Sequence, residues 1–163
     1  MLCFAYGSNM SRARLQARLV SARFVAVASL SGHRLSFNKV GTDGSAKCNA
    51  AATGRAGDRV VGVVFELDEA EKPVLDRIEG LGVGYEDKHI EVLTTDGERL
   101  AAVMYAAIRL DPSLKPYSWY RYHVLMGARE HGLPPDYIAR IEAVDVLEDP
   151  DRERHQRELA IYR

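Results

Sequence analysis

A two-residue turn between two strand-like segments constrains the fold of this chain more than any other feature of its sequence. Asp96 and Gly97 separate segments 89–95 and 99–108, and an Asp-Gly pair between two strands is typical of a tight β-hairpin. A hairpin requires its two strands to run antiparallel and to pair with each other. The sequence therefore predicts an antiparallel element in the sheet that the chain forms.

Other strand-like and helix-like segments surround this hairpin. The expected strands are 2–6, 24–30, 33–38, a weak 47–53 and the clearest, 59–67, which is rich in β-branched residues. Ser31 and Gly32 are expected to join the second strand to the third, and 39–45 is expected to be a loop. The expected helices are 11–19, a segment from the capping-box pair Asp68 and Glu71 to Gly80, 118–130 and 136–143. Because the strands come early and helices do not strictly alternate with them, the order predicts an α+β fold: a small mixed, barrel-like β-sheet with surrounding helices.

Length and charge limit the organisation and the partners of the chain. Its 163 residues suffice for a buried core and no repeat or linker divides them, so we expect a single domain over 1–163. The charge-dense segment 148–163 is expected to be loosely held. A net charge of −1 gives no general attraction to nucleic acid or membranes, and no apolar run approaches the roughly 18 residues of a membrane span. We interpret the local basic cluster Arg12, Arg14 and Arg18 as a solvated helix face.

Cysteines and histidines give no sign of a disulfide or metal site. Cys3 and Cys48 form neither a disulfide framework nor a metal-binding spacing. Because the N-terminus also lacks the features of a signal peptide, we expect a cytoplasmic protein with reduced thiols. The five histidines include no HExxH motif and no ligand pair four residues apart, so no metal ion is expected.

The stretch FAYGSNM at residues 4–10 breaks an apolar run with three turn-forming residues. Gly7 allows a ligand to approach the backbone closely, and the N-terminus of the following helix favours negative charge. These features suit a pocket for an anion or an oxyanion. The alternative is a plain turn in which Ser8 or Asn9 caps the helix, and the residues Tyr6–Asn9 alone favour that interpretation.

Glu79 stands where the helix before Gly80 ends, next to a glycine-rich loop that runs to Tyr85. The negative end of the helix dipole makes this position unfavourable for a carboxylate unless another role requires it, and general acid/base catalysis is such a role. An exposed glutamate tolerated at small cost explains the residue in isolation equally well. Tyrosines are also concentrated along the chain, and because most tyrosines only pack a ring and satisfy a hydroxyl, we expect two of them to be functional. The tyrosines in this concentrated set are Tyr85, Tyr105, Tyr117, Tyr120 and Tyr122.

Five segments taken in order resemble the γ-glutamylcyclotransferase family, also called AIG2-like. They are FAYGSNM, VVGVVFELDEAEKPVLDRIEG, GVGY, AAVMYAA and WYRYHVLMGAREHGLP, which span about residues 2–141. The resemblance implies a barrel-like sheet and a hydrophilic cavity between the YGSN turn and the helix end that carries Glu79. It makes Glu79 the catalytic glutamate, because this residue precedes the glycine of DRIEG. The substrate-binding residues that it implies are Cys3, Phe4, Ala5, Tyr6, Gly7, Ser8, Asn9, Tyr85, Tyr105 and Tyr120.

The reaction implied by the resemblance is attack of a substrate α-amine on its own γ-amide carbonyl, which yields 5-oxoproline and a free amine. Glu79 would take a proton from the ammonium and later give one to the leaving amine, while the amides of Gly7, Ser8 and Asn9 hold a carboxylate or the oxyanion. No metal or organic cofactor is required. The expected partner is a small γ-glutamyl substrate, and we expect no binding to nucleic acid or to a membrane. The sequence does not decide whether the chain forms a homodimer.

Two departures from the family pattern bear on substrate specificity. Cys3 stands where relatives often carry an aromatic residue, and the loop from Glu79 to Tyr85 is one residue shorter than in some relatives. Asn9 also differs from the leucine that glutathione-specific relatives carry after YGS. Two other functions stay open: a non-catalytic member that binds a γ-glutamyl or other small ligand, and a tailoring enzyme that removes a γ-glutamyl protecting group during biosynthesis.

Overall fold

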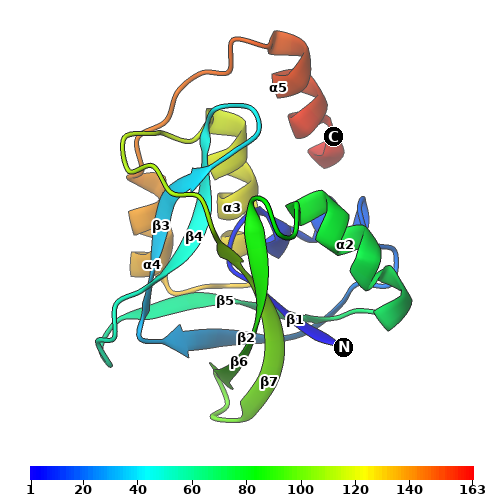
Figure 1. Ribbon diagram of the computed structural model, residues 1–163, viewed down its shortest axis with the longest axis vertical. Helices are drawn as coiled ribbons and strands as arrows, with labels where there is room; N and C mark the ends of the chain where they lie inside the picture. The colour runs from blue at the N-terminus through cyan, green and yellow to red at the C-terminus, as the bar shows by residue number, and fades with distance from the viewer.

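Five strands close into a barrel, and a two-stranded hairpin lies beside it (Figure 1). The computed structural model describes residues 1–163. The strands follow the order β1-β5-β2-β6-β7 around the barrel, and β7 returns to β1 through a parallel pairing of Cys3 with Val103. This architecture confirms the expected α+β fold with a barrel-like sheet. The barrel strands are β1 (Leu2–Ala5), β2 (Arg23–Ser31), β5 (Arg59–Glu66), β6 (Tyr85–Thr94) and β7 (Arg99–Ala107), and the separate hairpin is β3 (His33–Val40) with β4 (Ala46–Ala52).

Helices and short 3₁₀ turns surround the strands (Figure 1). The helix predicted over 118–130 is confirmed, the last predicted helix begins one residue earlier than expected, and no helix is long and apolar enough to cross a bilayer. The helices are α1 (Arg12–Gln16), α2 (Lys72–Glu79), α3 (Ser118–Glu130), α4 (Pro135–Glu142) and α5 (Arg152–Leu159). The 3₁₀ turns are η1 (Ser8–Met10), η2 (Glu69–Glu71) and η3 (Ala160–Tyr162).

The predicted Asp96-Gly97 hairpin is present between β6 and β7, which pair antiparallel over their whole length. Gly97 has a φ of 86°, a conformation that glycine adopts without a steric penalty. Strands β2 and β3 also meet at Gly32, but they do not pair with each other. Instead, β2 pairs with β5 and β6, while β3 pairs with β4. The expected loop is shorter than predicted, because β3 continues to Val40 and includes Lys39.

Strand β5 forms the centre of the core. Its residues from Val60 to Phe65 are all buried, and the Tyr137 hydroxyl of α4 accepts a hydrogen bond from the Val61 N–H at 3.2 Å. Gly62 is needed for close strand packing: a Cβ at this position would lie 2.4 Å from the carbonyl oxygen of Ala5. This contact fixes the end of β1, the point from which the YGSN turn departs.

Helix α3 holds that turn from the other side. A Cβ on Gly127 would lie 2.5 Å from the backbone of Met10, so the glycine allows α3 to pack directly against η1. Met10 is fully buried in this contact. The apolar contacts of α3 and β5 therefore position the turn between them as a rigid part of the fold.

Two expectations about local structure were wrong. The segment after 148 is not loosely held: it forms helix α5, which lies beside α3 (Figure 1). Asp151 caps α5 by accepting a hydrogen bond from the Arg154 N–H at 2.9 Å, and buried Asp149 pairs with the Arg154 side chain. Glu71 does not complete a capping box with Asp68, because its carboxylate accepts hydrogen bonds from Ser21 instead.

Candidate active site

A small cavity of about 50 Å³ lies where β1, the YGSN turn and the end of α2 meet. Every residue that the resemblance assigned to the site lines it. Twelve of the sixteen lining residues are hydrophobic, so this inner cavity is more apolar than expected, and its other polar side chains besides the tyrosines are Ser8, Asn9 and Glu79. The predicted lining residues are Cys3, Phe4, Ala5, Tyr6, Gly7, Ser8, Asn9, Glu79, Tyr85, Tyr105 and Tyr120, and those not predicted are Leu15, Cys48, Phe65, Leu67 and Leu75.

The YGSN turn is not a helix cap. Ser11 caps α1 instead, and its hydroxyl accepts a hydrogen bond from the Arg14 N–H at 3.4 Å. Ser8 Oγ accepts from Arg14 Nε at 3.2 Å. The backbone N–H groups of Gly7 and Asn9 are used by no hydrogen bond within the chain. They are therefore available to a carboxylate or an oxyanion, as the first interpretation of the turn required.

Glu79 is the last residue of α2, and Gly80 ends the helix in the left-handed conformation with a φ of 68°. Its Oε1 accepts a hydrogen bond from Asn9 Nδ2 at 2.8 Å and lies 3.4 Å from Arg18 Nη1. The same Arg18 nitrogen donates to Asn9 Oδ1 at 2.8 Å. Oε2 of Glu79 has no partner within the chain, so one carboxylate oxygen is held in place while the other is free.

The tyrosines form fixed walls of the cavity. Tyr120 accepts a hydrogen bond from the backbone N–H of Cys48, and Tyr85 donates to the carbonyl of the same residue, both at 2.9 Å. Tyr105 donates to Asp76 at 2.6 Å, and the Tyr6 hydroxyl donates to the Tyr105 carbonyl. Burial raises the pKa of Tyr85 and of Tyr120 well above the usual value, so both stay neutral.

The two cysteines that line the cavity are free and buried. Burial raises the pKa of the Cys3 thiol, and that of Cys48, to about 12. A thiol acts as a nucleophile in its ionised form. Neither cysteine is therefore a nucleophile at neutral pH, and Glu79 is the titratable group of the cavity best placed to move a proton.

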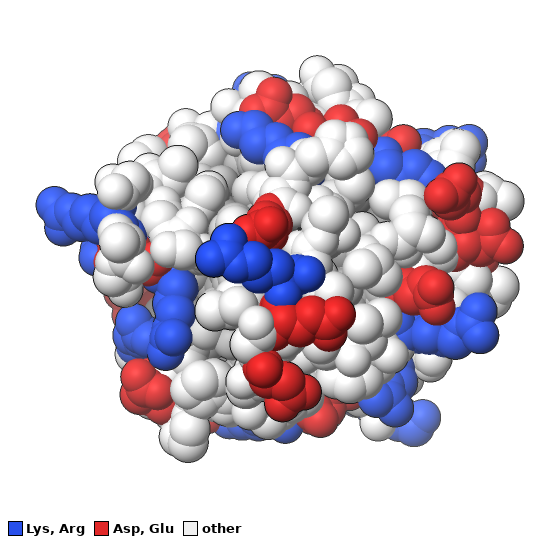
Figure 2. Space-filling model, turned by 90° about the horizontal axis from the view of Figure 1, so that it is seen from below, with Lys and Arg blue, Asp and Glu red and all other residues white.

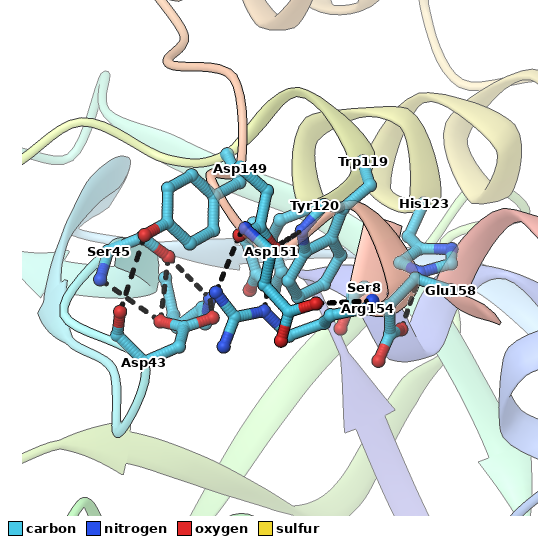
Figure 3. A network of polar contacts seen from close by, with 12 residues as sticks. Ser8, Asp43, Ser45, Trp119, Tyr120, His123, Asp149, Asp151, Arg154 and Glu158 are labelled. Atoms are coloured by element: carbon cyan, nitrogen blue, oxygen red, sulfur yellow. Dashed lines mark hydrogen bonds and ion pairs between the residues drawn. The ribbon is translucent and has the colours of Figure 1, made fainter. Parts of the chain in front are cut away.

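A wider cleft of about 520 Å³ adjoins the cavity and shares Ser8, Glu79, Tyr85 and Tyr120 with it. Helix α5 contributes Arg154 and Glu158 to one wall, where they lie among side chains from the YGSN turn, the β3–β4 hairpin and α3 (Figure 3). Glu79 therefore lines both the inner cavity and the larger space. A substrate with one part in each compartment would place the bond between them beside this carboxylate.

Arg14 and Arg18 were missed by sequence reasoning, which interpreted them as a solvated helix face. Both are largely buried, and they contact Ser8, Asn9 and Glu79 as described. Arg14 lies in α1, and Arg18 lies two residues beyond the end of this helix. Their spacing of four residues is the only local sign of their role. The partners that hold them lie far away in the sequence, so no local pattern could reveal the contact.

The fold and the cavity define a class of protein, and comparisons with known proteins agree with it. The model of the AIG2-like family matches residues 59–141. A solved structure described as a γ-glutamyl cyclotransferase superposes with a TM-score of 0.88 at 27% identity, covering 99% of this chain and 98% of that one. The chain belongs to the AIG2-like family, as its motifs indicated.

Curated relatives within this family carry a specific name. The chain is 33% identical to a human γ-glutamylcyclotransferase over 148 residues, which cover 88% of this chain and 78% of the relative. It is 32% identical to the bovine γ-glutamylcyclotransferase over the same length and coverage. The similarity therefore extends well beyond the segment that the family model matches.

Proposed function

We propose that this chain is a γ-glutamylcyclotransferase, which converts a γ-glutamyl amine or amino acid to 5-oxoproline and the free amine. The observation that carries the proposal is the contact of Glu79 with the YGSN turn, in which Asn9 Nδ2 donates to Oε1 at 2.8 Å beside unused backbone N–H groups. A proton carrier and an anion pocket thus lie at one cavity. Sequence similarity to the human and bovine enzymes supports the same activity.

Glu79 has two tasks in this reaction. It removes a proton from the substrate α-ammonium, and the freed nitrogen lone pair forms a bond to the γ-carbonyl carbon. Glu79 gives this first proton to the amide nitrogen and then accepts the second proton of the ring nitrogen, which it passes to the departed amine, so that the amine leaves as an ammonium and Glu79 returns to its carboxylate form. The old carbon–nitrogen bond breaks, and its electron pair leaves with the amine. The step needs no water, oxidant or reductant.

The YGSN turn and the cavity walls supply the geometry. The N–H groups of Gly7 and Asn9 hold either the α-carboxylate or the oxygen that becomes negative during attack. The rigid tyrosine walls keep the γ-glutamyl part bent, and ring closure to five members is fast once the chain is held in that shape. The leaving amine extends into the wider cleft.

Replacing Glu79 with Gln tests the proposal. The substitution keeps the size and the hydrogen bond from Asn9, but it removes the proton carrier. We expect turnover to fall at least about 10²–10⁴-fold, the range for one general acid/base. The measurement is 5-oxoproline release from a panel of γ-glutamyl compounds, read by mass spectrometry.

Glu142→Gln is the matched control, because Glu142 also ends an eight-residue helix but lies outside the cavity and the cleft. The Glu142→Gln variant should convert the γ-glutamyl substrates at the wild-type rate. Absence of 5-oxoproline from the whole panel with the wild-type protein would leave a non-catalytic binding protein as the better interpretation. If the Glu79→Gln variant keeps more than about a tenth of wild-type turnover, Glu79 is not the general acid/base of the reaction.

We also propose a cytoplasmic location. Both cysteines are buried and unpaired, the state expected where thiols are kept reduced. Fractionation of cells that produce the tagged chain tests this, and recovery in an exported fraction would contradict it.

A further inference from the structure

Arg14 is a largely buried cation that contacts the YGSN turn. On the face shown in Figure 2, Lys and Arg side chains lie at the surface beside acidic ones, whereas only 12% of the Arg14 side chain is exposed. Its Nε donates to Ser8 Oγ at 3.2 Å, and its guanidinium lies over the ring of Trp119, 6.0 Å from the ring centre. Burying a charged group is costly unless it is paired and hydrogen-bonded. The partners of Arg14 therefore indicate what this side chain is held in place to do.

Two groups outside α1 fix the orientation of the Arg14 guanidinium. Its Nη1 donates to Glu158 Oε2 of α5 and lies 3.0 Å from Nε2 of His123 in α3 (Figure 3). Nη1 carries two hydrogens, so it serves both partners, and Glu158 also supplies the counter-charge. Because the guanidinium is planar and rigid, holding one end of it fixes the direction of the Nε–H as well. The contacts with α3 and α5 thus direct the Nε–H toward Ser8.

The donors and acceptors of this network follow from the contacts. An arginine nitrogen only donates, so Nε2 of His123 is the acceptor and the ring proton lies on Nδ1. Nδ1 then donates to the Tyr162 hydroxyl at 2.7 Å, and that hydroxyl donates to Ser11 at 2.9 Å. Each contact on the path from Arg14 to Ser11 therefore joins a donor to an acceptor. At its other end, Arg14 contacts Ser8 as a donor.

The contact with Arg14 leaves the hydrogen of the Ser8 hydroxyl free. Ser8 Oγ accepts from Arg14, and the Ser8 O–H has no acceptor within the chain. Like Glu79, Ser8 lines both the inner cavity and the wider cleft, so it lies beside the bond of a substrate that occupies both compartments. A hydroxyl whose oxygen accepts from another donor becomes a stronger donor itself, because hydrogen bonds in a chain polarise one another. The Ser8 hydroxyl therefore suits an oxygen that gains negative charge.

We propose that Arg14 is a positioning residue of the reaction: by donating to Ser8 Oγ, it directs the Ser8 hydroxyl hydrogen to the γ-carbonyl oxygen of the substrate. This inference rests on the proposed function. The hydroxyl joins the N–H groups of Gly7 and Asn9 around that oxygen, and its hydrogen bond strengthens as the oxygen becomes negative during attack. An interaction that strengthens in the transition state raises kcat rather than lowering KM. Arg14 acts through Ser8 and does not contact the substrate.

Steady-state kinetics of Ser8→Ala, Arg14→Gln and the double variant test the proposal. The measurement is 5-oxoproline release from the γ-glutamyl compound of the panel that the wild type converts fastest. We expect Ser8→Ala to lower kcat about 10²–10³-fold, the usual cost of one lost oxyanion donor, with KM little changed. Arg14→Gln should lower kcat by about tenfold or more, the size of one charge-assisted hydrogen bond. In the Ser8→Ala background, Arg14→Gln should lower kcat little further, because the hydroxyl that Arg14 directs is absent.

Arg12→Gln is the matched control, because Arg12 lies on the same helix but is exposed and lines neither the cavity nor the cleft. The Arg12→Gln variant should keep the wild-type kcat and KM. If Arg14→Gln lowers kcat equally with and without the Ser8 hydroxyl, the inference is overturned, since Arg14 would then act on the substrate or on the fold. A raised KM with unchanged kcat in Arg14→Gln would overturn it too, because that result belongs to a direct contact with the bound substrate.

Two further measurements keep the inference testable if Arg14→Gln does not fold. Glu158→Gln removes the counter-charge that holds the guanidinium, and it should lower kcat in the wild-type background but not in the Ser8→Ala background. Ser8→Ala removes only a hydroxyl, and a wild-type kcat in this variant, with a thermal melt that shows a folded protein, would overturn the inference by itself. Absence of turnover on the whole panel with the wild-type protein would remove the proposed function, and the inference with it.

Discussion

At the scale of single residues, Gly7 shows how the site depends on space rather than on backbone conformation. Its φ of −118° is accessible to any residue. A Cβ at this position, however, would lie 2.9 Å from the Cβ of Cys48 and 3.3 Å from the Tyr120 hydroxyl. The glycine thus lets the turn pack against β4, and the two tyrosines that bind the Cys48 backbone hold β4 in that place.

We predict that Gly7→Ala reduces the free energy of unfolding by about 1–3 kcal/mol, the usual cost of overpacking. Turnover should fall as well, because the turn must move away from Glu79. A double-mutant cycle with Cys48→Gly, measured by urea unfolding, identifies the cause. If the clash is with the Cys48 side chain, Gly7→Ala costs less in the Cys48→Gly background. Additive effects of the two substitutions would show that the clash lies elsewhere.

The sequence predicted the residues of the cavity better than their interactions. The motifs brought together Glu79, the YGSN turn and three tyrosines, because order and spacing along the chain are visible in a sequence. The role of Arg18 was not visible. Its two partners, Asn9 and Glu79, lie 9 and 61 residues away, and only the closed fold places them together.

At the scale of elements, α5 is attached mainly by polar contacts, to which Leu159 adds apolar packing against the core. None of its residues is buried. Asp149, which is buried just before the helix, accepts hydrogen bonds from Trp119 Nε1 at 2.8 Å and from two nitrogens of Arg154 at 2.6 Å each (Figure 3). Arg154, with Trp119 and the Asp151 N–H, holds the pKa of Asp149 well below its usual value despite burial.

We predict that Arg154→Met releases α5 from the body of the protein. The substitution leaves a buried carboxylate without its main partner, which costs several kcal/mol where the charge stays buried. Undocking of α5 relieves that cost locally. Amide hydrogen exchange over Arg152–Leu159 should therefore accelerate while β5 stays protected. Arg157→Met, an exposed position on the same helix, should exchange like the wild type. Unchanged protection of α5 in Arg154→Met would contradict this account.

The same contacts explain why this element could not be predicted. A charge-dense segment with few apolar residues has the composition of a disordered tail. Its partners are Trp119, 30 residues from Asp149, and Arg14, 144 residues from Glu158. The Asp96-Gly97 hairpin, by contrast, was predicted because its signal is contained in adjacent residues. Local signals are visible in a sequence, and long-range ion pairs are not.

At the scale of the whole molecule, one buried network joins the C-terminus to the YGSN turn. His123 is completely buried; its Nδ1 lies 2.7 Å from the Tyr162 hydroxyl, which donates to Ser11 at 2.9 Å. On the other side of the ring, Nε2 lies 3.0 Å from Arg14 Nη1. The same nitrogen lies 3.1 Å from Glu158 Oε2 (Figure 3). Burial lowers the pKa of His123 to about 4, and Arg14 adds to the effect. Although burial opposes it, contacts with His123 and Arg14 lower the pKa of Glu158 to about 2.

Both shifts predict that acid destabilises the fold. Between pH 6.5 and about 4 the unfolded chain binds a proton at His123 that the folded protein does not, so stability falls as the pH drops through that window. The loss is on the order of 3 kcal/mol. The contribution of Glu158 is present above pH 4.5 and is lost as the pH falls toward about 2. Urea unfolding at about pH 7, 5.5 and 4.5 measures the first window, which His123→Gln should flatten because glutamine does not titrate there. An equally steep loss in the variant would assign the pH dependence to other groups.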